Sequence, residues 1–170
     1  MKTLGANGIK TLKIVHLLFA FMWIGGAFSM ILLLFTTSPA EIGEMYMRSR
    51  VLQLIDDWLI IPGAVGCLLT GVVYGIWSKW GFFKHRWITI KWILTFAMVL
   101  FGTFAMGPWV NGNVYSVDEM FRYTTENSEF ARNVSLSAIC GSIQTACLLF
   151  IVVISVLKPW KKKKDTSAKK

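Results

Sequence analysis

The chain has 170 residues, of which 55% are hydrophobic, and it carries a formal net charge of +9. A soluble domain of this length needs far less apolar surface, so the composition indicates an integral membrane protein. The positive charge would suit a nucleic-acid partner, but the basic residues cluster at the ends of apolar segments, and we therefore expect no nucleic-acid binding.

Four apolar segments follow one another along the chain, at residues 12–35, 58–78, 87–108 and 134–157. Each is long enough to cross about 30 Å of hydrocarbon at 1.5 Å per helical residue. The sequence therefore predicts an all-α fold, an integral membrane four-helix bundle. Residues 1–160 form its single four-span transmembrane domain, and residues 161–170 form a basic tail.

The charges are distributed unevenly between the two sides of this bundle. Fourteen basic residues lie before or at the start of the first segment, between the second and third segments or at the start of the third, and after the fourth. Only four arginines lie in the other two connections. The positive-inside rule then places both termini in the cytoplasm, with a bacterial inner membrane as the expected location and anionic lipid headgroups as contacts for the basic tail. Eight of the nine acidic residues, including Asp56 and Asp57, fall in the two outer connections.

The first segment contains His16, an ionisable side chain at a costly position inside a membrane. Such a residue faces a partner, a cofactor or a water-filled cavity, and imidazole is a common ligand of haem iron. Phe19, Trp23 and Met30 recur on the same helical face, and Gly25 lies beside it. Small residues of this kind admit either a neighbouring helix or a flat ligand, so simple helix packing remains an alternative.

The second segment is preceded by an amphipathic stretch that contains Arg48 and Arg50. Pro62 and Gly63 lie four residues into the apolar run, and we expect them to kink the helix or open its first turn. The Gly71–Gly75 pair fits close contact with another helix.

The third segment begins with Trp87 and Lys91. A lysine near a helix end can extend to the headgroups, yet Lys91 and His16 lie at similar depths from the same membrane surface and could border one pocket. The connection from 111 to 132 is polar and predicts a short helix or lid. The fourth segment has no charge, and its polar side chains, Ser137 and Gln144 among them, are expected to form hydrogen bonds between helices.

Taken in order, these motifs resemble the small bacterial haem or copper membrane families that include CopD-like proteins. They are most similar to the HemJ-type membrane protoporphyrinogen oxidases and related four-span proteins of unknown function. The likeness covers nearly the whole chain. It rests on His16, Arg50-Val51-Leu52, Pro62-Gly63, Trp77, Trp87 with Lys91, and Lys158-Pro159-Trp160.

The resemblance implies haem b as the cofactor. In the HemJ-type family the first-helix histidine and the third-helix lysine are the functional pair, which implies His16 as an axial iron ligand and Lys91 as a second ligand or a partner for a haem propionate. Those proteins tend to have a further histidine in the third helix, where this chain has Met98 and Met106. If His16 is one ligand, the other side of the iron would be taken by Lys91, by Met98 or by no residue at all. Trp23 and Arg50 complete the set of candidate cofactor-binding residues.

Three functions remain open at this point. The first is a haem b-binding membrane protein that sequesters, senses or handles haem or a related porphyrin. The second is a membrane haem oxidoreductase of the protoporphyrinogen oxidase type that passes electrons to quinone. The third is a cofactor-free small transporter or accessory subunit in which His16 only packs. A homo-oligomer is compatible with all three.

Overall fold

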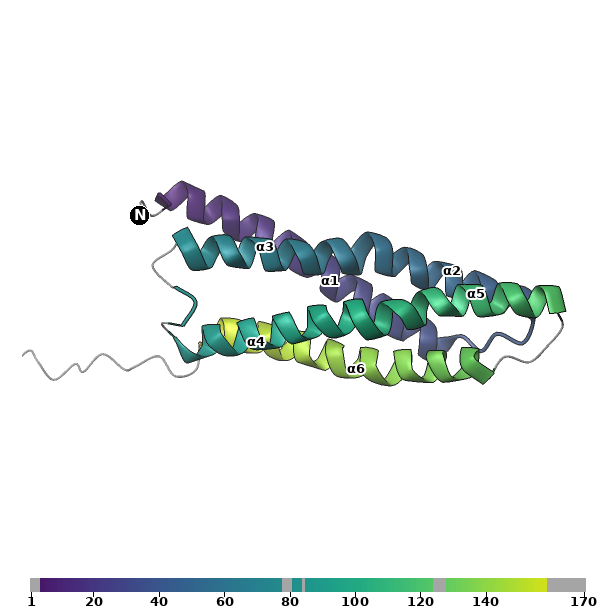
Figure 1. Cartoon of the computed structure of the whole chain (residues 1–170). Coiled ribbons are helices and arrows are strands. Elements are labelled where there is room, and N and C mark those ends of the chain that lie inside the picture. The colour runs from purple at the N-terminus through teal and green to yellow at the C-terminus, as the bar shows by residue number, and fades with distance from the viewer. Residues whose placement is uncertain (1–3, 78–80, 84, 124–127, 159–170) are drawn as a thin grey trace, which may run out of the picture.

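The computed structural model describes residues 4–77, 81–83, 85–123 and 128–158, and the described chain is helical apart from short connections (Figure 1). Its elements run in the order α1 (Ala6–Thr36), α2 (Ile42–Ile55), η1 (Asp56–Ile60), α3 (Ile61–Trp77), α4 (Arg86–Phe101), η2 (Gly102–Met106), α5 (Gly107–Tyr123) and α6 (Ser128–Leu157). The η segments are π-helical.

Within these described ranges, four helices are long and apolar enough to cross a membrane: Ala6–Thr36, Ile42–Trp77, Arg86–Met120 and Ser128–Leu157. The predicted all-α four-span bundle is confirmed. The helices of the second and third spans are much longer than the apolar segments predicted from the sequence. The reason is that α2, η1 and α3 form one continuous rod, and α4, η2 and α5 form another. The polar connection expected as a short helix or lid therefore begins as an extension of the third span.

Each π-helical segment ends two residues before a proline. The amide of Ile61 donates to the carbonyl of Asp56 just before Pro62, and the amide of Gly107 donates to the carbonyl of Gly102 just before Pro108. A proline has no amide hydrogen, and its ring clashes with the carbonyl four residues earlier in a regular helix. The extra residue in a π-turn relieves that conflict, so the helices continue through their prolines instead of ending there.

The bundle core is built around α1, which packs most extensively against α3 and also against α6. Its inward face supplies Trp23 and Ala27, which join Ala64, Met98 and Leu148 in the main cluster of buried residues. Large apolar side chains elsewhere are exposed, as membrane-facing side chains of a bundle this small must be. The helical face predicted from the spacing of the first segment is therefore the buried one.

Glycines on α3 set the distance between α1 and α3. A Cβ atom on Gly63 would lie 2.6 Å from the backbone nitrogen of Trp23, and one on Gly66 would lie 2.2 Å from the ring of Phe19. By contrast, a Cβ atom on Gly25 would meet nothing within 4 Å. Close packing against α1 therefore occupies the glycine face of α3 at Gly63 and Gly66.

Both ends of the described chain lie at one end of the bundle (Figure 1). The amide of Leu4 donates to the carbonyl of Trp77 at 3.1 Å, which ties the start of the chain to the end of α3. The same-side termini agree with an even number of spans, and their cytoplasmic placement remains a prediction. The basic tail at 161–170 lies outside the described residues.

Candidate functional site

His16 is held at the α1–α3 interface by a hydrogen bond to Thr70. The imidazole Nδ1 lies 2.7 Å from the hydroxyl oxygen of Thr70, and the ring is half-buried. The same hydroxyl lies 2.6 Å from the carbonyl oxygen of Gly66 and 3.2 Å from that of Cys67. Three polar atoms therefore converge on one buried hydroxyl group.

This geometry assigns the imidazole tautomer. A carbonyl oxygen can only accept, so the single hydroxyl proton of Thr70 must point to the carbonyls of its own helix. The remaining contact is satisfied when Nδ1–H of His16 donates to the Thr70 oxygen. The lone pair then lies on Nε2, the nitrogen that does not contact Thr70, and the ring has the form of a metal-ligating histidine oriented by a hydrogen bond behind it.

Two further α3 side chains enclose His16. The ring of Tyr74 meets the imidazole edge-on, with centroids 6.0 Å apart and an interplanar angle of 85°, while its hydroxyl donates to the carbonyl of Ile9 at 3.4 Å. The Cys67 thiol contacts the His16 carbonyl at 3.9 Å. Because residues three and four apart share one helical face, Cys67, Thr70 and Tyr74 form a single strip against α1.

Lys91 approaches this region from α4. Its ammonium lies 6.0 Å from the ring centroid of Trp87, one turn earlier, and its side chain is half-buried. It is close enough to interact electrostatically with both His16 and Cys67. The structure thus brings the two ionisable residues of the predicted pair into one neighbourhood, and their role as a ligand pair stays a prediction.

The other three candidate residues lie elsewhere. Trp23 and Met98 come together, at 5% and 6% exposure, but deeper in the bundle than His16 and Lys91. Arg50 is exposed on α2, where its guanidinium donates to the side-chain oxygen of Gln53. The rod from α2 to α3 is continuous, so Arg50 stands about 30 Å from Thr70 at 1.5 Å per residue.

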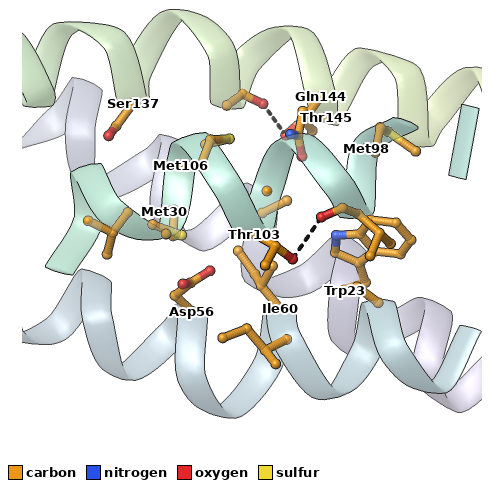
Figure 2. Close-up of a pocket in the computed structure, with 18 of the residues that line it drawn as sticks. Trp23, Met30, Asp56, Ile60, Met98, Thr103, Met106, Ser137, Gln144 and Thr145 are labelled. Atoms are coloured by element: carbon orange, nitrogen blue, oxygen red, sulfur yellow. Dashed lines mark hydrogen bonds between the residues drawn. The ribbon is translucent and has the colours of Figure 1, made fainter. Parts of the chain in front are cut away.

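A cavity of about 490 Å³ forms a second candidate site in the middle of the bundle (Figure 2). Both π-helical segments line it, as do α1, α3, α4, α5 and α6. Trp23 and Met98 belong to its walls, whereas His16 and Lys91 do not. The π-turns that accommodate the two prolines therefore also shape the walls of this space.

The polar residues of the cavity were assigned other roles from the sequence. Asp56 was expected in an outer connection, but the helix that begins at Ile42 continues into the bundle and places its side chain at the cavity wall. Asp57, its neighbour, is exposed on the outside. The sequence did contain a signal for this longer helix: the amphipathic stretch before Pro62 fits a helix that packs against the bundle with one face.

The polar side chains of α6 also differ from expectation. The hydroxyls of Ser142 and Thr145 donate to carbonyls four residues earlier in their own helix and do not bridge helices. The Ser137 hydroxyl and the Gln144 amide nitrogen are buried, line the cavity and have no hydrogen-bond partner within the described residues. Ser137 is only 4% exposed. Such atoms are costly to leave unpaired, which makes this wall a candidate for ligand contacts.

No curated protein and no solved structure matches this chain. A family model does match, over residues 10–159, and its description is "Predicted integral membrane protein (DUF2269)". That range begins before His16 and includes all four candidate spans. The chain is therefore a multi-pass integral membrane protein that belongs to the DUF2269 family.

Proposed function

We propose that this protein binds haem b in the membrane and that Nε2 of His16 is an axial ligand of the iron. The single observation that carries the proposal is the hydrogen bond between Nδ1 of His16 and the hydroxyl of Thr70. Because the Thr70 proton is directed to the carbonyls of its own helix, this contact leaves the lone pair on Nε2. An oriented neutral imidazole is the form that ligates iron, and an intramembrane histidine without such a role would be an expensive packing residue.

Lys91 is the candidate for the second role near the cofactor. Because Lys91 lies near His16, it fits two roles. As a cation it would pair with a haem propionate, and as a neutral amine it would ligate the other face of the iron. Met98 fits this role less well, because it lies about 10 Å further along α4, seven residues from Lys91, and packs with Trp23 in the core. Arg50 is too distant to share a haem with His16.

Bound haem would supply a redox-active iron, and this chain's residues would orient His16, place a positive charge beside it and exclude water from it. These features support a protein that sequesters, senses or handles haem in a bacterial inner membrane. They do not by themselves call for catalysis, so protoporphyrinogen oxidation with quinone as acceptor is the alternative that turnover would reveal.

The test is the visible spectrum of the protein purified in detergent, recorded oxidised and reduced after addition of hemin. We expect a Soret band in the wild type, its loss or marked shift in His16→Ala, and its retention in His85→Ala. His85 is the matched control because it is the chain's other histidine and lies just before α4. A wild type without any Soret band would refute haem binding, and an unchanged band in His16→Ala would refute the assigned ligand.

Lys91→Ala separates the two roles of the lysine. A propionate partner would change the affinity for hemin while the band positions stay close to those of the wild type. An iron ligand would instead shift the Soret and α bands, because the ligand field of the iron changes. Protoporphyrinogen consumption by the haem-loaded protein would favour the oxidoreductase.

A further inference from the structure

The central cavity opens sideways, towards the membrane. Four residues that line it are themselves exposed on the surface of the bundle: Ile61, Val65, Thr103 and Pro108. They come from α3 on one side and from η2 and α5 on the other, so the opening lies between the two rods that contain the prolines. A ligand that uses this route arrives from the hydrocarbon phase and must be soluble in lipid.

One charged side chain stands in the cavity wall. Asp56 is the only ionisable residue among the described residues that line the space, and its carboxylate has no hydrogen bond or ion pair within the described chain. The arginine on the same rod, Arg48, directs its guanidinium to the carbonyl of Thr37 at 3.2 Å. A carboxylate within an otherwise apolar span is costly unless a positive charge compensates it.

The remaining walls suit an organic cation. Trp23 presents an aromatic ring, which attracts cations by its quadrupole, and Met30, Met98 and Met106 contribute polarisable thioethers. On the α6 side, the unpartnered Ser137 hydroxyl can accept a hydrogen bond from a bound group. Figure 2 shows Asp56 across the space from Ser137 and Gln144.

We propose that this cavity is a binding site for lipid-soluble organic cations, with Asp56 as the counter-ion that selects them. The apolar walls hold the body of the ligand, and the carboxylate discriminates against neutral and anionic molecules of the same shape. The site is distinct from His16 and does not depend on haem, because His16 and Lys91 are absent from its lining. An acyl chain or a neutral lipophile is the competing occupant.

The test uses three phenyl-substituted probes of different charge, each titrated separately into the purified protein in detergent. They are the cation tetraphenylphosphonium, the anion tetraphenylborate and the neutral triphenylphosphine oxide. We expect saturable binding of the cation by the wild type, seen by calorimetry and as quenching of tryptophan fluorescence, and at least tenfold weaker binding of the other two.

Asp56→Asn should weaken binding of tetraphenylphosphonium at least tenfold, because it removes the charge and keeps the shape. Asp57→Asn is the matched control: it makes the same chemical change one residue along the same π-helical segment, on an exposed side chain. We expect it to bind the cation as the wild type does. Equal binding by Asp56→Asn and Asp57→Asn would overturn the proposal.

A second variant covers the case in which Asp56→Asn fails to fold. Gly141 lines the cavity from α6, and a Cβ there would lie 3.5 Å from the terminal methyl of Met106, an ordinary contact. Gly141→Leu should therefore fill part of the space without touching Asp56 and weaken cation binding. Unchanged binding in that variant, or wild-type binding of triphenylphosphine oxide as strong as that of the cation, would refute the site.

The haem proposal and the cation proposal can be refuted independently of each other. His16→Ala should lose the Soret band and still bind tetraphenylphosphonium, whereas Asp56→Asn should lose cation binding and keep the Soret band. Loss of cation binding in a correctly folded His16→Ala would show that the two regions are one site, which would overturn the assignment of the cation to the central cavity.

Discussion

Replacement of Gly63 by alanine is expected to destabilise the bundle more than any other single methyl addition on the α1–α3 interface. The new Cβ would lie 2.6 Å from the backbone nitrogen of Trp23 and 2.9 Å from the backbone oxygen of Phe19. Both atoms belong to the backbone of α1, so no side chain can rotate to relieve the contact. The helices would have to separate along the interface on which α1 packs most extensively.

The magnitude follows from two opposing effects. Alanine is a better helix former than glycine by about 1 kcal/mol. Overpacking a tight interface typically costs about 1–3 kcal/mol, and the cost is at the upper end or beyond where backbone meets backbone. We therefore expect Gly63→Ala to lower the free energy of unfolding by about 2 kcal/mol or more.

Two other glycines provide the comparison. Gly66→Ala would strike the ring of Phe19, a side chain that can turn, so its loss should be smaller. Gly25→Ala would meet nothing within 4 Å and should be neutral or stabilising by up to about 1 kcal/mol. Unfolding by sodium dodecyl sulfate in mixed micelles, followed by circular dichroism, measures all three. A Gly63→Ala variant as stable as Gly25→Ala would refute the inferred closeness of α1 and α3.

Three more predictions concern the sites and their supports. Thr70→Val should weaken hemin binding about 10–100-fold in a spectroscopic titration, because the histidine loses the oxygen that orients it, and Thr70→Ser should keep most of the affinity. Gln53 on α2 donates to the side-chain oxygen of Asn111 on α5 at 2.6 Å. A double-mutant cycle with alanine at both positions should therefore give a coupling energy of about 0.6 kcal/mol. A coupling energy of zero would contradict this hydrogen bond. Met98→Ala should lower the free energy of unfolding by about 2 kcal/mol or more, because Met98 is 6% exposed. Met47 is 61% exposed, so Met47→Ala should change it by less than about 0.5 kcal/mol. Equal losses in the two variants would argue against the core described above.

The sequence by itself determined the number of spans and the position of His16 near the start of the first one. Hydropathy is a local property of each segment, and depth follows from counting residues along a helix, so neither needs knowledge of the neighbours. The same counting placed Lys91 near the level of His16. It could not supply Thr70, because the partner of an imidazole depends on which face of α3 meets α1.

Tertiary structure alone decided the central cavity. The sequence located a proline at the start of the second apolar run but not the π-turn that lets the helix pass through it, and so Asp56 was assigned to a connection. Packing of α2 on α5 stabilises that longer helix, and this contact joins residues far apart in the chain. Whether Ser137 faces a neighbouring helix or an open space likewise depends on how α6 packs against the two long rods, which no single segment encodes.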